Sequence, residues 1–316
     1  MTRCRGQARL TATGSRIVRL PSASDQTTPH IVDLLIEERA PFLLHQPVTR
    51  WLMRHLLYPV LGYADARAAV DRIYDLPGPA IMDLGVDELG LRVSSLGLSR
   101  LPRQGRVVIV ANHPTGLADG VAVWQALRPI RRDLMMLANS DAIRIAPGLR
   151  DVFIPVEWTK GKRSQAGSRR LLTDVAGAFR REVALVIFPS GRISYLRWRG
   201  LTERPWLATA VSLARKFKAP IYPLHVRARN SALFYALSQI STELRDVTLF
   251  NELLNKHGQR YELTLGLPID PDELPEDPQA AIEALQRHVE HELPRASRQQ
   301  PRIELARRRP LPRFGI

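Results

Sequence analysis

The 316-residue chain has a single cysteine, no long apolar run and too few acidic residues to balance its basic ones. The lone Cys4 excludes an intramolecular disulfide and a metal cluster built on cysteine, and such cysteine usage is typical of a reducing, cytosolic location. No segment reaches the roughly 18 uncharged apolar residues that a membrane-spanning helix requires. We therefore expect a chain that is soluble or peripheral on the cytoplasmic face of a membrane, with no transmembrane span.

Acidic residues are outnumbered 31 to 46 by lysine and arginine, which gives a formal net charge of +15 and a pI near 10.8. Such a chain attracts polyanions, either nucleic acid or anionic lipid headgroups. The sequence contains no zinc-finger spacing, no basic heptad helix and no aromatic RNA-binding signature. Nucleic acid is therefore the less expected of these two polyanionic partners.

The composition divides the chain into five regions. Residues 1–30 are rich in arginine, serine and threonine, and are interpreted as a disordered basic tail or, alternatively, as a targeting segment. Residues 31–84 have helical periodicity, 85–270 alternate between strand and helix patterns, and 271–294 contain a further helix. Residues 295–316 are rich in arginine and proline, and this composition predicts a second basic tail.

The alternation of strand and helix patterns predicts the fold. Short apolar runs from Arg106–Ala111 to Ile221–Val226 are separated by helical segments, a rhythm typical of a mostly parallel sheet with helices on both faces. The alternating pattern of Leu91–Gly97 predicts an exposed strand that leads into this sheet. The pattern of Tyr261–Leu267 predicts a late strand at the edge of the sheet. The fold class is therefore α/β, a mostly parallel central sheet flanked by helices and preceded by a helical N-terminal extension.

Residues 47–58 predict a helix that begins with proline at its first position. Its apolar residues, among them Trp51 and Leu52, follow helical spacing. Two interpretations are open. Tryptophan and tyrosine at headgroup depth fit a helix that lies in a membrane interface, whereas the same pattern fits a helix packed on the core.

The most informative stretch is Val107–Ala111 with the residues after it. This apolar, β-branched run predicts a buried strand that ends before Pro114. His113 stands at its tip, and Asp119 follows six positions later. A histidine can act as general base near neutral pH, and a carboxylate beside it fixes its tautomer. No serine or cysteine nucleophile is evident beside the pair, so the nucleophile can be the acceptor hydroxyl itself; the alternative is a histidine that merely caps the next helix.

Four blocks carry a resemblance to a known family. Asn112–Asp119 resembles the His/Asp motif of the lysophospholipid (glycerolipid) acyltransferase superfamily, and Val186–Ser194 resembles its Phe-Pro-Glu-Gly-Thr-Arg-Ser block. Between them, Val152–Val156 stands where the family has an apolar second block, and Ala219–His225 resembles the fourth. Order and spacing agree over about residues 85–270. The resemblance implies an acyltransferase domain over this range.

Two departures from the family pattern indicate one branch. Five residues separate His113 from Asp119 where the standard motif has four, with Gly116 as the additional residue, and Ser190 replaces the usual glutamate. Both features resemble the hemolysin-like branch, which includes acyltransferases that make ornithine lipids. The resemblance implies that His113 is the general base and that Asp119 orients it. A lyso-ornithine-lipid-like acceptor is then favoured over lysophosphatidic acid.

The implied reaction is O-acyl transfer from an acyl thioester to the hydroxyl of a lyso-lipid. The donor would be acyl carrier protein or coenzyme A, and the chemistry needs no metal or other cofactor. One alternative is a 1-acyl-sn-glycerol-3-phosphate acyltransferase of phospholipid synthesis. Another is a non-catalytic basic protein on the same scaffold that binds membranes or nucleic acid.

Two further segments are expected to contact the substrates. The third block follows a buried strand, so its residues lie at the same sheet edge as His113. There Arg192 pairs with an anion or forms a structural salt bridge, and backbone donors near Gly191 stabilise an oxyanion. A basic loop after the second block binds phosphate or is a solvated face. The predicted substrate-binding residues are Asn112, Lys162, Arg163, Ser190, Gly191 and Arg192.

Overall fold

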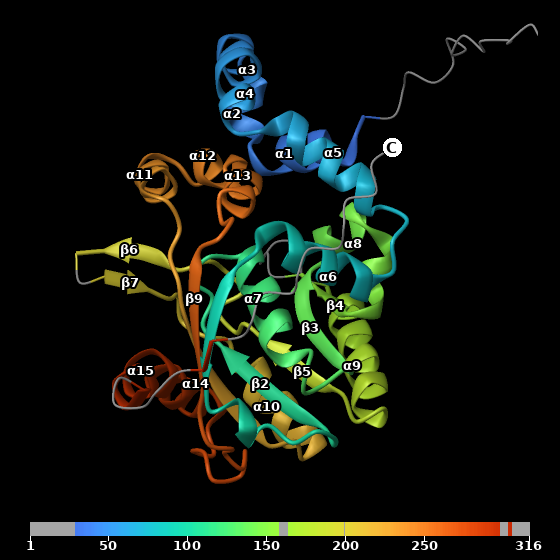
Figure 1. Cartoon of the computed structure of the whole chain (residues 1–316), viewed down its shortest axis with the longest axis vertical. Coiled ribbons are helices and arrows are strands. Elements are labelled where there is room, and N and C mark those ends of the chain that lie inside the picture. Colours follow the sequence, from blue (N-terminus) through green and yellow to red (C-terminus); the bar gives the residue numbers. More distant parts are fainter. Residues whose placement is uncertain (1–28, 158–163, 199, 298–302, 305–316) are drawn as a thin grey trace, which may run out of the picture.

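The computed structural model describes residues 29–157, 164–198, 200–297 and 303–304. Its body is an eight-stranded sheet with helices on both faces, and further helices cap one end of it (Figure 1). In spatial order the strands are β10 (Ile303–Glu304), β1 (Arg92–Leu96), β9 (Arg260–Leu265), β8 (Ile221–Arg227), β2 (Val107–Ala111), β5 (Ala184–Ile187), β3 (Leu134–Asn139) and β4 (Phe153–Val156). A separate two-stranded hairpin consists of β6 (Tyr195–Arg197) and β7 (Gly200–Thr202).

The sheet is mostly parallel. All neighbouring strands from β8 to β4 run in the same direction, and β1 is parallel to β9. The two antiparallel pairs are β8 with β9 and β1 with β10. Parallel neighbours need long crossover connections, which helices supply here. The prediction of an α/β fold with a mostly parallel sheet is confirmed.

Two strands are placed differently from the sequence-based expectation. The strand expected to be exposed, β1, buries Val93, Ser94 and Ser95 between two neighbours. The strand expected at the edge, β9, lies inside the sheet between β1 and β8. Both predictions were wrong for the same reason. Serine in β1 and Glu262 in β9 give an alternating pattern typical of an exposed or edge strand, but β9 and β10 flank β1, and β1 and β8 flank β9.

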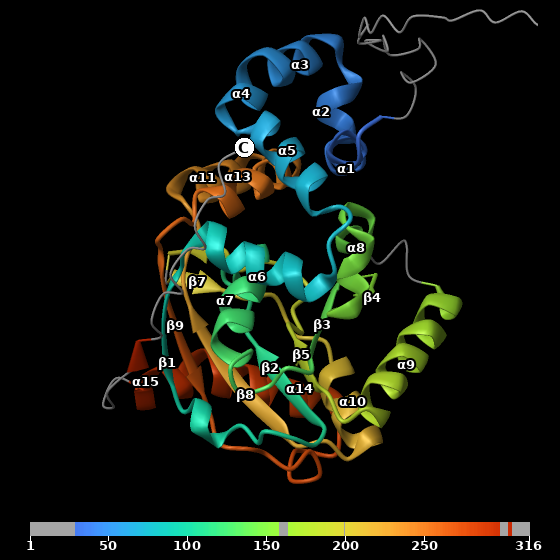
Figure 2. The same ribbon diagram turned by 45° about the vertical axis from the view of Figure 1, so that its right-hand side comes forward.

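Helices cover both faces of the sheet (Figure 2). On one face, α6 (Gly78–Leu89) and α7 (Leu117–Leu127) pack against alternate residues of β2. On the other face, α9 (Gln165–Arg180), α10 (Thr209–Phe217) and α14 (Pro278–Arg287) pack against the remaining residues of that strand. Because β2 is covered on both sides, all five of its residues are apolar and buried.

Local signals begin and end several of these helices. The hydroxyl of Ser164 accepts the N–H of Gly167 at the start of α9, and the carboxylate of Asp277 accepts the N–H of Ala280 at the start of α14. Gly90 ends α6 in the left-handed conformation. The remaining helices and turns of the body are α8 (Asp141–Ile145), α15 (Leu293–Ser297), the 3₁₀ turns Leu98–Arg100 and Pro147–Asp151, and the π-helical turn His288–Glu292.

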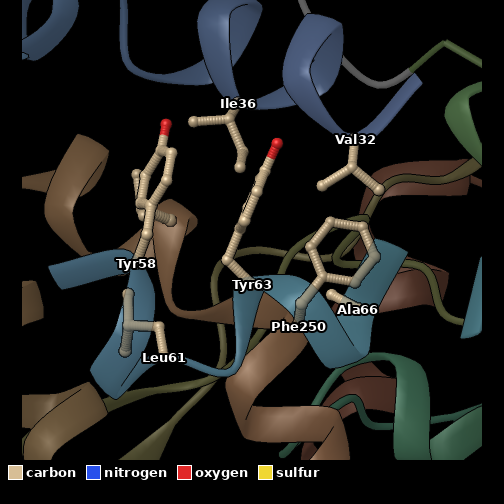
Figure 3. Close-up of a pocket in the computed structure, with 8 residues that line it drawn as sticks. Val32, Ile36, Tyr58, Leu61, Tyr63, Ala66 and Phe250 are labelled. Atoms are coloured by element: carbon tan, nitrogen blue, oxygen red, sulfur yellow. The ribbon is translucent and has the colours of Figure 1, made fainter. Parts of the chain in front are cut away.

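The helical cap comes from two parts of the chain. The first comprises α1 (Ile31–Arg39), α2 (Pro41–His45), α3 (Pro47–Leu52), the π-helical turn Met53–Leu57, α4 (Tyr58–Val60) and α5 (Tyr63–Ile73). The second lies between β8 and β9 and comprises α11 (Ala232–Ile240), α12 (Thr242–Val247) and α13 (Leu249–Leu254). Figure 3 shows their contact, where Val32 and Ile36 of α1 lie over Tyr63 of α5 and Phe250 of α13. Apolar packing therefore joins two segments that are distant in sequence.

The predicted helix over residues 47–58 is present as α3, the π-helical turn and the start of α4. The side chains of Val48, Trp51, Leu52 and Leu56 are exposed to solvent. The same segment buries Met53 in the apolar cluster of the cap and packs Tyr58 against it. The segment therefore packs on the cap with one side and exposes apolar side chains on the other. Within the described ranges, every helix is too short or too polar to cross a bilayer.

Candidate active site

His113 stands at the carboxyl end of β2, in the middle of the sheet between β5 and β8. Both neighbours run parallel to β2, and the carboxyl ends of parallel strands share one edge. This edge is where open α/β sheets bind their ligands. The side chain of His113 is 20% exposed. The fold thus holds the backbone of this residue firmly while leaving its imidazole accessible.

The structure brings together the two residues predicted to form the catalytic pair. Nδ1 of His113 lies 3.0 Å from Oδ2 of Asp119, whose side chain is completely buried. The N–H direction at Nδ1 is not aligned for a full hydrogen bond, so this contact is chiefly electrostatic. Catalytic hydrogen bonds often tighten once substrate is bound. In the described part of the chain no hydrogen bond engages Nε2, so that nitrogen can face a substrate hydroxyl.

Gly116 explains the five-residue spacing between His113 and Asp119. Its φ of +88° lies in a region that residues with a side chain rarely adopt. A Cβ at this position would lie 2.6 Å from Cδ1 of Ile193. Gly116 directly precedes α7, and its N–H donates to Oδ2 of Asp119 over 2.9 Å. The additional glycine therefore turns the chain so that the first turn of α7 brings the carboxylate back to the histidine.

The carboxylate of Asp119 is held by several donors. Oδ2 also accepts the N–H of Thr115 at 2.8 Å, and Oδ1 accepts the Thr115 hydroxyl at 2.5 Å. Because that hydroxyl donates to Asp119, its contact of 2.9 Å with the Tyr261 hydroxyl is one in which the tyrosine donates. Burial and the nearby Asp119 charge raise the pKa of Tyr261, which keeps the phenol protonated. These hydrogen bonds fix the carboxylate in one orientation.

A second buried carboxylate, Glu203, holds the backbone of the histidine. Its Oε1 accepts the N–H of His113 at 2.7 Å and the hydroxyl of Ser194 at 2.6 Å, while Oε2 accepts the indole N–H of Trp206 at 2.8 Å. The N–H of Ser194 in turn donates to the carbonyl of His113 over 3.0 Å. Burial raises the pKa of Glu203, and these hydrogen bonds oppose that rise. Both polar groups of the His113 backbone are therefore fixed.

Sequence reasoning did not identify Glu203. Ser194 closes the third block, but Glu203 lies nine residues further on, outside any of the four blocks. The hairpin β6–β7 separates these two residues in sequence and returns the chain to the same place. The only sequence signal is an acidic residue beside Trp206 in a segment that is otherwise basic.

The third block forms a turn against the histidine. The ring of Phe188 lies 4.4 Å from that of His113, measured between centroids. The hydroxyl of Ser190 donates to the carbonyl of Arg192 over 2.8 Å, and the N–H of Gly191 donates to the carbonyl of Phe188 over 3.0 Å. The Gly191 amide, expected as an oxyanion donor, is therefore already engaged within the turn. Ser190 likewise stabilises this turn.

Arg192 is exposed, and no acidic side chain of the described residues pairs with it. This fits the expected contact with an anion better than the alternative of a structural salt bridge. The other two basic residues predicted to bind substrate, Lys162 and Arg163, lie outside the described residues.

Asn112 has a different role from the expected substrate contact. Its Nδ2 donates to the carbonyl of Val226 over 2.8 Å, and its Oδ1 accepts the N–H of the same residue at 2.6 Å. Both ends of the amide thus bind the backbone of β8. The structure assigns Asn112 to joining β2 and β8 directly before the histidine.

The chain is similar in sequence to known acyltransferases. Residues 92–227 match the family model described as Acyltransferase, a range that contains His113, Asp119 and Glu203. The chain is 27% identical over 198 residues to a lyso-glycine lipid O-acyltransferase of Phocaeicola vulgatus, covering 61% of this chain and 69% of that protein. It is 23% identical over 245 residues to the protein of the same name from Bacteroides thetaiotaomicron, covering 75% and 87%.

A solved structure is also similar. The crystal structure of the 1-acyl-sn-glycerophosphate (LPA) acyltransferase PlsC from Thermotoga maritima aligns with a TM-score of 0.45 at 13% identity, over 85% of this chain and 98% of that one. The matched range 92–227 contains the four blocks and the pair His113 and Asp119. The chain contains an Acyltransferase domain over residues 92–227, and the family match and the two relatives support its assignment to the glycerolipid acyltransferase superfamily.

Proposed function

We propose that the chain is a lipid O-acyltransferase that moves a fatty acyl group from a thioester to the hydroxyl of a lyso-lipid with an amino-acid headgroup. The observation that carries this proposal is the contact between His113 and the buried, multiply hydrogen-bonded carboxylate of Asp119. It supports a general base at the sheet edge, with Nε2 directed to the substrate.

His113, Asp119 and the two substrates account for every bond and proton of the proposed reaction. Nε2 of His113 takes the proton of the acceptor hydroxyl as its oxygen attacks the thioester carbonyl. The new O–C bond forms, the C–S bond breaks, and the thiolate leaves and takes up the proton. Asp119 stabilises the imidazolium that exists between these events. A thiolate is a good leaving group, so the step requires no metal ion.

The acceptor is inferred from three features. Ser190 is short and neutral where the family usually has glutamate, and Arg192 is available for an anion. The branch resemblance favours an ornithine lipid, and both curated relatives carry the name lyso-glycine lipid O-acyltransferase. An amino acid acylated on its nitrogen keeps a carboxylate that Arg192 can bind. Lysophosphatidic acid instead presents a phosphate.

The basic net charge is compatible with both candidate donors and with a membrane location. A formal net charge of +15 complements an acidic acyl carrier protein, the phosphates of coenzyme A and an anionic membrane surface. We propose peripheral attachment to such a membrane, with the exposed apolar residues of α3 and the π-helical turn as one contact.

The test is a side-by-side assay of lyso-ornithine lipid, lyso-glycine lipid and lysophosphatidic acid with one donor at a time, acyl carrier protein or coenzyme A thioester. The proposal predicts a kcat/KM for one of the two amino-acid lipids about tenfold or more above that for lysophosphatidic acid. A clear preference for lysophosphatidic acid would refute the proposed amino-acid-lipid acceptor but not the acyltransferase activity.

Arg192→Gln tests the headgroup contact. We expect its KM for the amino-acid lipid to rise about tenfold, because a charge-assisted hydrogen bond is lost. The matched control is Arg132→Gln, which removes an exposed arginine just before β3, at the opposite edge of the sheet. Equal KM values in the two variants would exclude Arg192 from acceptor binding.

A further inference from the structure

We propose that the β6–β7 hairpin and α11 together form a membrane-docking surface beside the active site. We define this docking surface by Leu196, Trp198, Leu201, Leu233 and Ile240. The inference rests on the proposed function only in that the acceptor is a lipid. It concerns elements separate from α3, which the sequence pattern had suggested as a membrane contact.

The hairpin has one apolar face that is exposed to solvent. Leu196 and Leu201 are cross-strand partners, so their side chains project from the same face of the ribbon. Both are exposed, and Trp198 at the tip is 85% exposed. Figure 1 shows the hairpin projecting from the body beside α11. A two-stranded ribbon of this length is not stable by itself, and such a tip gains from an apolar environment.

The opposite face of the hairpin is basic. Tyr195 alternates with Leu196 along β6, and the guanidinium groups of Arg197 and Arg204 lie 5.3 and 5.5 Å from the centroid of its ring. These contacts hold two cations directly behind the apolar face. An apolar tip with tryptophan, backed by arginine, matches the depth profile of a membrane interface. There indole rings lie among headgroups and cations meet anionic lipid.

Helix α11 extends the apolar surface. Leu233 and Ile240 are seven positions apart and thus on one side of the helix, and Ile240 is 75% exposed. The buried side of the helix is formed by Phe234 and Tyr235 instead. No residue from 230 to 242 is charged. Helix α11 contacts β6, so the two elements are neighbours at the surface.

The hairpin is fixed to the catalytic histidine at its base. Ser194 precedes β6 and Glu203 follows β7, and these two residues bind the backbone carbonyl and N–H of His113. Lipid contact at the tip therefore places His113 a short distance from the membrane surface. A lyso-lipid could then present its hydroxyl to Nε2 without leaving the bilayer completely.

A membrane fits these observations better than a protein partner. The docking surface combines large apolar side chains with arginine and offers few hydrogen-bond partners that would specify a protein. Its elements also adjoin a site proposed to receive an acceptor that resides in membranes. An acidic acyl carrier protein would pair with the arginines but would leave Leu233 and Ile240 without partners.

The test variant is Leu196→Ser/Trp198→Ser in the full chain. Its matched control is Leu172→Ser/Leu267→Ser, which removes two exposed apolar residues of α9 and of the segment after β9. Binding is measured by co-sedimentation with vesicles of phosphatidylglycerol and phosphatidylcholine at low and high salt. We expect the test variant to bind about tenfold or more weakly, with the larger deficit at high salt, where apolar contact dominates. The control variant should bind like the parent protein.

Activity on lyso-lipid in vesicles and in detergent micelles separates this proposal from the proposed function. We expect the test variant to lose activity in vesicles and keep it in micelles. Reduced vesicle binding in a chain that acylates no lyso-lipid in either form would support the docking surface and refute the function. Equal vesicle binding by the test variant and its control would overturn the docking surface. Unchanged vesicle binding with weakened binding of acyl carrier protein would overturn it in favour of a protein-docking face.

Discussion

The backbone N–H of His113 donates to a buried carboxylate oxygen of Glu203 over 2.7 Å. This contact is independent of the one between the His113 ring and Asp119. Since Ser194 binds both Glu203 and the carbonyl of His113, the residue proposed as general base is held at its ring and along its main chain. Precise placement of the imidazole is needed because small displacements of a catalytic group cost large factors in rate.

Replacing Glu203 by glutamine should lower kcat about 10- to 100-fold with little change in KM, because the position of His113 is disturbed without loss of a substrate contact. The amide presents an N–H₂ group to one of the present donors. Trp206→Phe is the matched control, since it removes only the indole N–H on the other oxygen. Steady-state measurement of kcat and KM for the two variants tests this prediction. A kcat in Glu203→Gln equal to that of Trp206→Phe would show that the contact with His113 has no kinetic role.

Glu203 should also make stability depend on pH. Burial raises the pKa of this carboxyl above its ordinary value of 4.5. The folded chain therefore retains this proton to higher pH than the unfolded chain, so the contribution is fully present below the unfolded pKa. It is lost as the pH rises through the folded pKa. Urea unfolding from acidic to neutral pH should show the wild-type protein losing stability relative to Glu203→Gln. If the free energy of unfolding of the wild-type protein, measured relative to that of Glu203→Gln, stayed constant or rose with pH, this prediction would be contradicted.

Gly116→Ala should lower both stability and activity. The substitution strains a φ of +88° and places a Cβ 2.6 Å from Ile193, so Asp119 is displaced from His113. We expect a loss of about 1–3 kcal/mol in the free energy of unfolding and at least about tenfold in kcat. Gly105→Ala is the control, because its φ is +87° but no atom lies within 4 Å of the added Cβ. Wild-type kcat in Gly116→Ala would exclude this role.

The two hydroxyl groups that help to hold the Asp119 carboxylate, those of Thr115 and Tyr261, should differ in their effect on kcat. Thr115→Val removes the hydroxyl that binds Oδ1 directly, so we expect kcat to fall about tenfold or more. Tyr261→Phe removes only the donor to that hydroxyl, and its effect should be a few-fold. Kinetics of both variants, with circular dichroism as a check of folding, test the order. A larger loss of kcat in Tyr261→Phe than in Thr115→Val would contradict the predicted order.

Much of this arrangement could be predicted from the sequence. The apolar run Val107–Ala111 is informative because a strand covered on both faces must be apolar throughout. Pro114 marks its end, and the pair His113 and Asp119 is close enough in sequence for the following helix to bring together. These are local relationships, which residue pattern and spacing describe well.

The remaining features depend on contacts between distant segments. Glu203 lies 90 residues from His113, and its role exists only because the β6–β7 hairpin returns the chain to the sheet edge. The amide of Asn112 meets Val226 across 114 residues, so its local motif suggested substrate binding where the structure has a link between strands. The sequence predicts β9 as an edge strand, because its neighbour β1 comes from far earlier in the chain and the local pattern does not reveal it.

We infer that His113 is the general base of acyl transfer. The most direct measurement is the rate of transfer to a lyso-lipid by His113→Ala, with Asp119→Asn alongside and His291→Ala as a control for loss of an exposed histidine. We expect that His113→Ala folds normally but loses about 10²–10⁴-fold in kcat, that Asp119→Asn is also severely impaired, and that the control keeps full activity. Full transfer activity in a correctly folded His113→Ala protein would contradict it.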